Sequence, residues 1–317
     1  MDKMNDIVNR FCCRMSCLPE FLLSGIGLVL LFLLTLLPGE ELPQAPEIPL
    51  IDKWSHLLAF GLVSTALLFD IGRFCGRLTW KLWFATGMAM TLLGAVVELL
   101  QGWMGLGRSA DCMDGVADAL GAFLLPLIFL PLLRRTIECY LCRLDSYAGD
   151  KSILPRVMDL YMMSFPPEER RDWDDLRAKA CDPGKPLSLT VVRSRRRFAG
   201  FITYWDLGGV RYVEHFAIDP ALRGTAIGAR AIKKFTANAS TPVVLEVEPA
   251  SDGEMARRRI GFYQRCGFQP HPDFEYLQPP YAPGLPELPL MLMTRGSVPD
   301  LHGVSEAIRT QVYGVHL

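Results

Sequence analysis

The pattern of apolar and polar positions divides the chain into two halves. Up to residue 133, four apolar stretches run almost without interruption, and they cover residues 21–37, 54–71, 80–100 and 115–133. Each comes close to the roughly 17–25 residues that a helix needs to cross the hydrocarbon of a bilayer. We therefore predict that residues 1–145 form an all-α transmembrane domain of four helices.

Beyond a polar break at residues 147–151, helix and strand patterns alternate. The predicted helices are 152–165, 167–180, 223–238 and 253–266. The predicted strands are 187–193, 198–206, 210–218, 243–247 and 288–294. This order predicts an α/β domain over residues 151–295, with a mixed sheet flanked by helices, followed by a C-terminal tail at 296–317.

The basic residues beside the apolar stretches predict an orientation in the membrane. Lys and Arg cluster at residues 3–14, 73–81 and 134–135, whereas the connection 39–52 has four acidic residues and no basic one. Lys and Arg near span ends stay on the cytoplasmic side. We thus predict a multi-pass protein of the cell membrane, with both termini and the α/β domain in the cytoplasm.

Composition changes this picture little. The mean hydropathy is +0.21 although 21% of residues are charged, as expected if apolar residues are concentrated in one half. The net charge of −1 gives no electrostatic reason to expect a nucleic acid as partner. Nine scattered cysteines do not resemble a disulfide framework, so mostly free thiols are expected.

The predicted topology gathers polar residues near the outer ends of the spans. They are Asp52, Lys53, His56, Glu98, Gln101, Arg108, Asp111, Asp114 and Asp118. Ionisable groups in hydrocarbon are costly and need partners or water, so such a set indicates a functional site in the membrane domain. The alternative is a salt-bridged plug that holds four short helices together. A single histidine is a weak metal signal, and no metal is expected.

Three blocks of this region resemble the signature of the VanZ-like membrane family. They are residues 52–56 (DKWSH), residues 98–101 (ELLQ), and residues 108–114 (RSADCMD) followed by Gly121. Asp118 departs from the family pattern, which usually has Asn there. The resemblance covers about residues 20–135. It implies a module of unestablished biochemical activity, associated with glycopeptide resistance or the cell envelope. A catalytic role of His56 with Glu98 is a separate hypothesis that the resemblance does not supply.

In the second half, residues 213–228 predict an anion site. A strand ends at Ile218, Asp219-Pro220 breaks it, and a turn of small residues opens a helix. The backbone N–H groups at a helix start lack intrahelical partners and attract anions, so the turn is a candidate pyrophosphate cradle.

This segment resembles motif A of the GNAT acyltransferases. Arg223 and Gly228 match the ends of the motif, while Ala226 takes the place of its central Gly. We expect Ala226 in a right-handed helical turn, with weakened rather than abolished CoA binding.

Three further blocks extend the GNAT resemblance to about 140 residues. Residues 259–268 resemble motif B of the family. Residues 245–249 resemble the strand that separates from its neighbour to admit the pantetheine arm of CoA, and residues 276–281 resemble a motif of a bacterial subgroup. The resemblance implies a mostly antiparallel GNAT sheet, acetyl-CoA as cosubstrate and a primary amine as acceptor. It assigns the cofactor-binding residues to Phe216, Ala217, Ile218, Arg223, Gly224, Thr225, Ala226, Ile227 and Gly228.

The resemblance also suggests catalytic roles. The backbone of residues 216–218 would polarise the thioester carbonyl. Tyr263 is the candidate general acid for the leaving thiolate, and a packing aromatic is its alternative. Glu214, Glu246 and Glu248 are candidates to relay the amine proton, with Glu214 slightly preferred. We expect His215 to pack rather than to act as a base.

Three functions are compatible with these observations. The first is a membrane-bound N-acetyltransferase that acts on the cytosolic side and is fused to a VanZ-like module. In the second, the GNAT domain is a non-catalytic acetyl-CoA sensor that regulates the membrane domain, as Ala226 would favour. In the third the spans are a bare anchor, although an anchor does not require the polar cluster between residues 52 and 118.

Overall fold

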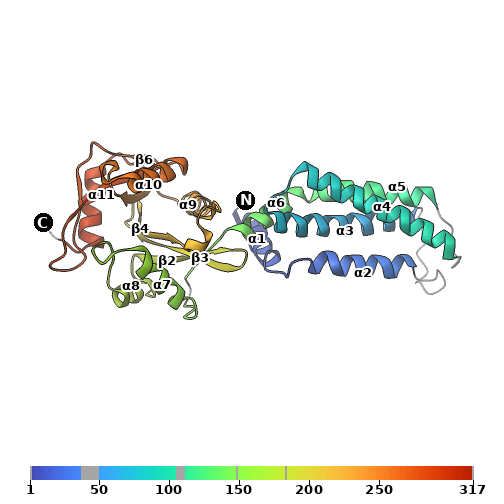
Figure 1. Ribbon diagram of the computed structural model, residues 1–317, viewed down its shortest axis with the longest axis horizontal. Helices are drawn as coiled ribbons and strands as arrows, with labels where there is room; N and C mark the ends of the chain where they lie inside the picture. The colour runs from blue at the N-terminus through green and yellow to red at the C-terminus, as the bar shows by residue number, and fades with distance from the viewer. Residues whose placement is uncertain (1, 37–49, 105–110, 148, 183, 316–317) are drawn as a thin grey trace. The chain divides into compact units, whose positions relative to one another are not determined.

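The computed structural model describes residues 2–36, 50–104, 111–147, 149–182 and 184–315 (Figure 1). The chain divides into two compact units, residues 1–141 and residues 142–317, which we call the helical unit and the α/β unit. The α/β unit therefore includes residues 142–150 and the segment after residue 295, both of which the sequence had placed outside its α/β domain.

Within the described residues, the helical unit contains six helices. They are α1 (Asp2–Met15), α2 (Leu22–Leu36), α3 (Ile51–Cys75), α4 (Trp80–Met104), α5 (Cys112–Ile128) and α6 (Leu130–Leu141). By length and composition, α3 and α4 are apolar and long enough to cross a membrane, and α5 with α6 would count as a third span only as one bent pair. Helix α2 has 15 residues, so four continuous spans are not evident.

The predicted span at 115–133 is not a single helix, because two prolines lie in this stretch. Helices α5 and α6 meet at 59°, and Pro131 lies in the first turn of α6. Amides in the first turn have no acceptor within the helix, so a proline there removes no helical hydrogen bond. Pro126, inside α5, cannot donate to the carbonyl of Ala122. That oxygen instead accepts a hydrogen bond of 2.8 Å from the Ser64 hydroxyl of α3.

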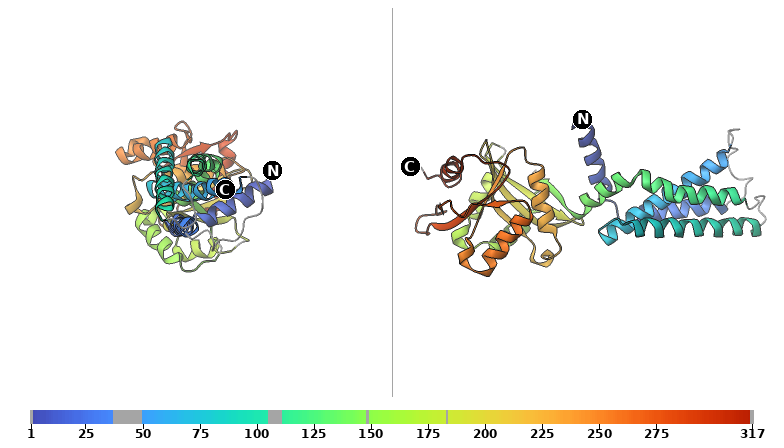
Figure 2. Two further views of the ribbon diagram at one scale, coloured as in Figure 1. Left: turned by 90° about the vertical axis from the view of Figure 1, so that its right-hand side faces the viewer. Right: turned by 90° about the horizontal axis from the view of Figure 1, so that it is seen from above.

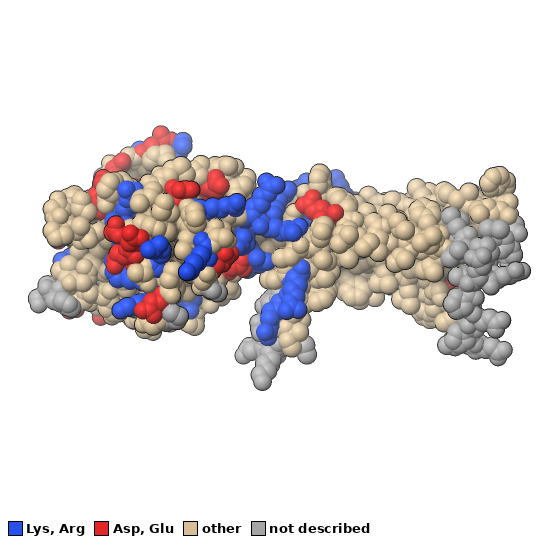
Figure 3. Space-filling view, turned by 90° about the horizontal axis from the view of Figure 1, so that it is seen from below, with Lys and Arg blue, Asp and Glu red and all other residues tan. Residues whose placement is uncertain are grey.

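The outside of the helical unit is apolar. Leu62, Leu92 and Leu99 are between 56% and 72% exposed, and Trp103 is 84% exposed. On the face shown in Figure 3, few charged side chains lie along these helices, whereas Lys, Arg, Asp and Glu are spread over the α/β unit. Such an apolar surface is unusual for a soluble protein and typical of an interaction or membrane surface.

Glycines allow helices α3 and α5 to pack closely. A Cβ added at Gly121 would lie 2.1 Å from the carbonyl oxygen of Leu57, and one added at Gly61 would lie 2.9 Å from the carbonyl oxygen of Gly121. Small residues at a helix crossing let the two backbones approach. This crossing brings the first turns of α3 and α5 together.

The α/β unit is built on one mixed sheet. Its strands are β1 (Arg143–Ser146), β2 (Leu187–Ser194), β3 (Arg197–Asp206), β4 (Arg211–Ile218), β5 (Val243–Val247), β6 (Gln269–Pro270), β7 (Tyr276–Gln278) and β8 (Leu288–Arg295). Their order is β1-β2-β3-β4-β5-β8-β6, with β7 paired to β8. Only β4 and β5 pair in parallel among the described strands, which confirms the predicted mixed, mostly antiparallel sheet.

Helices cover both faces of the sheet (Figure 2). They are α7 (Leu154–Ser164), α8 (Trp173–Ala180), α9 (Ile227–Ala237), α10 (Glu254–Arg265) and α11 (Leu301–Ala307), which continues as a π-helix (Ile308–Val312). One core packs α7, α8 and the π-helix against the sheet, and the other packs α9 and α10. Ile308 and Val312 are buried, so residues 301–312 complete the first core instead of forming a free tail.

The predicted helix at 167–180 is interrupted. Pro167–Glu169 form a single 3-10 turn, and α8 begins after Asp172, whose carboxylate accepts hydrogen bonds from the amides of Asp174 and Asp175. This N-cap satisfies amides that a helix start leaves without partners. The segment between the two elements carries Arg171 into the interior of the unit.

Candidate functional site

A cleft opens where strands β4 and β5 separate. The two strands pair only from Arg211 with Val243 to Val213 with Leu245, although β4 continues to Ile218 and β5 to Val247. The unpaired ends line a cleft of about 840 Å³, together with the first residues of α9 and one face of α10. The splay that the sequence predicted at residues 245–249 is present.

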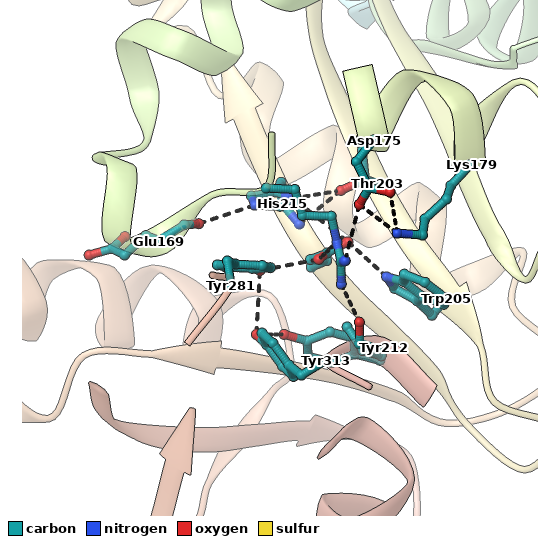
Figure 4. Close-up of polar contacts among 12 residues, drawn as sticks. Glu169, Asp175, Lys179, Thr203, Trp205, Tyr212, His215, Tyr281 and Tyr313 are labelled. Atoms are coloured by element: carbon teal, nitrogen blue, oxygen red, sulfur yellow. Dashed lines mark hydrogen bonds and ion pairs between the residues drawn. The ribbon is translucent and has the colours of Figure 1, made fainter. Parts of the chain in front are cut away.

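A bulge in β4 places two polar residues on the same face of the sheet. Thr203 of β3 lies opposite His215 and Tyr204 lies opposite Val213, so Glu214 is an extra residue in the ladder. An extra residue breaks the alternation of side chains along a strand. As a result, Glu214 and His215 both contact the aromatic core that α7 and α8 cover: Glu214 accepts a hydrogen bond from Trp205, and the His215 ring packs against Tyr161. Figure 4 shows His215 and Trp205 in this region.

Glu214 is held in a buried ion pair. Its carboxylate lies 2.6 Å from Nε of Arg171, and it accepts hydrogen bonds from Trp205 Nε1 at 2.7 Å and from the Tyr281 hydroxyl at 3.1 Å. Burial opposes its ionisation, but the charge of Arg171, the nearby His215 and the hydrogen bonds from Trp205 and Arg171 together outweigh burial and lower the pKa of Glu214 below its usual range. An anion so well satisfied is a weak proton acceptor.

Glu246 has a different environment. It accepts hydrogen bonds from the hydroxyls of Tyr276 and, at 3.3 Å, Tyr313. Burial raises the pKa of Glu246 to about 7, against the lowering effect of the tyrosine hydroxyls. Both carboxylates line the cleft, but Glu214 is held as an anion by Arg171, so Glu246 is the better candidate for a base near neutral pH.

Tyrosine hydroxyls connect the two carboxylates. The Tyr281 hydroxyl lies 3.4 Å from that of Tyr313, which in turn lies 3.2 Å from that of Tyr212 (Figure 4). Tyr281 belongs to the block 276–281 that the sequence singled out, whereas Tyr313 lies in the predicted tail. The only sequence signal for Tyr313 is the spacing of Ile308 and Val312, which puts both on one helix face.

His215 packs as the sequence predicted. It is 1% exposed, and its ring contacts Tyr161 and Phe165 edge-on at 4.9 and 4.8 Å between centroids. Its Nδ1 lies 3.1 Å from the Thr203 hydroxyl and its Nε2 lies 3.2 Å from the carbonyl of Glu169. Burial lowers the pKa of His215.

The predicted pyrophosphate cradle lies at the start of α9. Helix α9 begins at Ile227, not at Arg223, and its first backbone hydrogen bond runs from the amide of Arg230 to the carbonyl of Ala226 at 3.1 Å. The amides of Ile227, Gly228 and Ala229, in the first turn of α9, therefore remain available to an anion. Eight of the nine predicted cofactor residues line the cleft, and the exception is Thr225, whose hydroxyl donates to the Leu222 carbonyl at 2.6 Å.

The expected conformation of Ala226 is wrong. Its φ is 63° and its ψ is 6°, which is the left-handed region, because the chain reverses there to enter α9. The Cβ of an L-residue is strained in this region by about 1–2 kcal/mol. Gly224, two residues earlier, also has a positive φ of 79°, for which glycine is suited.

Tyr263 lies on α10 and lines the cleft. It is 8% exposed and packs edge-on against Phe262 and Phe268. Burial raises the pKa of its phenol, so the group is neutral and able to donate a proton. Both alternatives from the sequence, proton donor and packing aromatic, fit this position.

Comparisons with known proteins identify the family of the α/β unit. A family model described as the acetyltransferase (GNAT) family matches residues 154–268. A solved GNAT acetyltransferase from Bacteroides thetaiotaomicron is 38% identical, with a TM-score of 0.52, and the match covers 55% of this chain and 99% of that one. The chain belongs to the GNAT family. It has an N-acetyltransferase domain, and acetyl-CoA is its cosubstrate.

Other solved GNAT structures are more distant. A Bacillus subtilis acetyltransferase in complex with CoA is 10% identical with a TM-score of 0.35, and the match covers 50% of this chain and 99% of that one. An Elizabethkingia anophelis GNAT acetyltransferase with acetyl-CoA bound is 12% identical with a TM-score of 0.35, at 49% and 98% coverage. No curated protein matched the chain. The matched family residues lie entirely in the α/β unit.

Most of the polar residues predicted to converge in the helical unit are neighbours. Lys53 forms ion pairs with Asp111 and with Asp114, the latter at 2.5 Å, and His56 Nδ1 lies 3.0 Å from Asp118. The amide of Asp111 donates to Glu98 at 3.0 Å.

The other residues that the sequence predicted for this set lie at its edge or are not among the described residues. Asp52 is the most exposed of the paired acids, with 65% of its side chain accessible, and lies 3.3 Å from Lys53. Gln101 points its amide nitrogen to the carbonyl of Thr35 in α2, at 2.7 Å. Arg108 lies outside the described residues.

Proposed function

We propose that the α/β unit transfers the acetyl group of acetyl-CoA to a primary amine, with Glu246 as the proton acceptor and Tyr263 as the proton donor. The observation that carries this proposal is the position of Glu246 in the cleft, beside the unpaired end of β4 and with a pKa raised to about 7. A general base is most effective when its pKa lies near the working pH.

The arrangement supports a direct transfer. Backbone groups on the open edge of β4 would polarise the thioester carbonyl, as in oxyanion stabilisation. The amine attacks the carbonyl carbon and loses its proton to Glu246, directly or through water. The tetrahedral intermediate then breaks its C–S bond, and the departing thiolate takes a proton from Tyr263.

The test is release of CoA by the full-length protein against a panel of amines, polyamines, aminosugars and peptide N-termini. We expect at least one amine to be acetylated, and Glu246→Gln to abolish most of that turnover. Glu248→Gln is the matched control, because Glu248 directly follows the end of β5 and pairs with Arg259. Equal losses in both variants would contradict a specific role of Glu246.

A non-catalytic acetyl-CoA sensor is the second candidate, and the strained backbone of Ala226 favours it. Both candidates require acetyl-CoA to stabilise the folded protein against heat. Gly228→Glu should remove this protection by placing a negative charge at the cradle, whereas Gly228→Ala should keep it, since an added Cβ meets only ordinary contacts at 3.5 Å or more. Protection without turnover on any amine would support the sensor.

We further propose that the helical unit is a multi-pass, VanZ-like membrane module of the cell envelope, with both termini and the GNAT domain in the cytosol. The apolar outer surface, the long helices α3 and α4, and the distribution of Lys and Arg support this topology. A link to glycopeptide resistance follows from the VanZ resemblance alone.

Single-cysteine variants test this topology in intact cells. Cys112 and Cys181 are both exposed, the first at the start of α5 and the second in the GNAT domain. An impermeant maleimide should label a lone Cys112 in whole cells and a lone Cys181 only after lysis. Labelling of Cys181 in whole cells would place the GNAT domain outside, away from acetyl-CoA.

A further inference from the structure

Three helices bring an imidazole and two carboxylates together inside the helical unit. His56 of α3, Glu98 of α4 and Asp118 of α5 each offer a ligand atom, and these atoms all lie within 4.8 Å of one another. Ligands of zinc at about 2.0–2.2 Å from the metal lie roughly 3.3–3.5 Å apart, so small side-chain rotations would close the set around one ion.

Two oxygens of this cluster have no partner. Glu98 Oε1 and Asp118 Oδ2 are buried and make no hydrogen bond within the described structure. Glu98 is 8% exposed and Asp118 is 0% exposed. A buried carboxylate oxygen without a partner is costly, so each one calls for a proton, a water or a cation.

A second buried carboxylate of the same unit shows the contrast. Asp70 is also 0% exposed, but one of its oxygens binds Arg73 at 2.7 Å and the other accepts from the Ser24 hydroxyl at 2.7 Å. The helical unit therefore can satisfy a buried carboxylate with its own side chains. At Glu98 and Asp118, one oxygen of each has no hydrogen-bond partner among the residues that the structure describes.

The charges of the cluster are unbalanced among the described residues. Its acids are Asp52, Glu98, Asp111, Asp114 and Asp118, and its cations are Lys53 and, when protonated, His56. Lys53 is committed to Asp111 and Asp114. A divalent cation beside Glu98 and Asp118 would compensate the charges of these two buried carboxylates.

Other contacts shape the space around these three residues. A Cβ at Gly94 of α4 would lie 2.7 Å from Asp118 Oδ2, so the glycine gives this oxygen room beside α4. His56 Nε2 lies 4.0 Å from Asp114. A carboxylate beside the ring nitrogen that does not bind the metal commonly orients a metal-bound histidine, and Asp114 can do this for His56.

We propose that His56, Glu98 and Asp118 bind a divalent transition-metal ion, with Zn²⁺ as the best match. One imidazole nitrogen and two carboxylate oxygens form a mixed N/O set that suits such metals. Three protein ligands leave a fourth tetrahedral position open, as in catalytic rather than structural zinc sites.

The experiment uses the full-length protein in detergent, stripped with a chelator and then titrated with Zn²⁺ alone. We expect about one ion to bind per chain outside the thiols, and Co²⁺ in its place to give the visible absorption of a tetrahedral N/O site. Asp118→Asn and Glu98→Gln preserve side-chain shape and should each weaken binding by at least about tenfold. Glu138→Gln, at an exposed acid of α6 outside this cluster, should bind as the wild type does.

Thiols can also bind zinc, and Cys13 and Cys139 lie 3.5 Å apart in this unit. A double Cys13→Ser, Cys139→Ser variant should retain the ion if the proposal is correct. Wild-type protein that binds no Zn²⁺ or Co²⁺ beyond its thiols would overturn the proposal, whether or not the variants fold. Equal affinities of the wild type and Asp118→Asn would overturn it as well.

Discussion

The two units of this chain distribute polarity in opposite ways. In the helical unit the exposed surface is rich in Leu, Val and Trp, and carboxylates lie in the interior. In the GNAT unit two apolar cores lie on either side of the sheet. The informative residues therefore differ between the units. In the helical unit, exposed Leu side chains indicate an apolar environment, whereas in the GNAT unit, buried Glu side chains indicate where the chemistry takes place.

The buried carboxylates sharpen this comparison. Glu214 and Glu246 are surrounded by hydroxyls, an indole and a guanidinium of the same unit. Within the described residues, Glu98 and Asp118 each have one buried oxygen without a hydrogen bond. The carboxylates of the GNAT site are thus held by side chains of their own unit, whereas for Glu98 and Asp118 we propose a metal ion as the additional partner. The following changes test this contrast.

The largest effect is expected from Glu246→Gln. Loss of a general base should lower kcat by about 10²–10⁴-fold, with acetyl-CoA affinity nearly unchanged. Steady-state kinetics on any accepted amine, with acetyl-CoA binding measured in parallel, provides the check. A loss of less than about tenfold would assign the proton transfer to another group.

Glu214→Gln should act on stability instead. It leaves the Arg171 guanidinium, whose side chain is 8% exposed, without its buried counterion. Removal of one partner of a buried pair costs about 3–5 kcal/mol of unfolding free energy. Urea unfolding of the GNAT unit followed by tryptophan fluorescence measures this cost. Full stability with lost turnover would restore Glu214 as the catalytic base.

Tyr263→Phe distinguishes a proton donor from a packing aromatic. If the phenol protonates the thiolate, turnover should fall by roughly ten- to a thousandfold, because a general acid is lost. Affinity for acetyl-CoA should stay constant, since the ring remains. Parallel losses of affinity and turnover would indicate packing.

The pH profile should report Glu246 directly. Because only the ionised carboxylate accepts a proton, kcat/KM should rise as pH increases and level off, for this group, above about pH 7. Below that value the rate should fall about tenfold per pH unit. The Glu246→Gln variant should lack this limb, and an unchanged limb would mean that the substrate amine or another residue titrates.

The smallest effect is expected from Ala226→Gly. Glycine relieves the left-handed strain of about 1–2 kcal/mol, but it costs about 0.4–1 kcal/mol through the greater freedom of the unfolded chain. A net gain of at most about 1.5 kcal/mol is expected in unfolding free energy. Acetyl-CoA should bind at least as tightly. A loss of stability would mean that the methyl group makes contacts that outweigh the strain.

Much of the lining of the cleft could be predicted because its parts are local in sequence. The unpaired end of β4, the turn and the start of α9 occupy residues 214–229 without interruption. Strand alternation, the break at Asp219-Pro220 and small residues before a helix are all visible in one short segment. The polar cluster of the helical unit was predictable too, since antiparallel spans bring their ends together.

Only the tertiary structure distinguished the carboxylates from one another. The sequence could not pair Glu214 with Arg171, which is 43 residues away, or bring Tyr313 from beyond the last strand to Glu246, 67 residues away. It also could not show that a bulge turns Glu214 and His215 to one face, or that Ala226 is left-handed. Periodicity encodes which face a side chain takes, whereas its partner and its pKa depend on packing between segments that are distant along the chain.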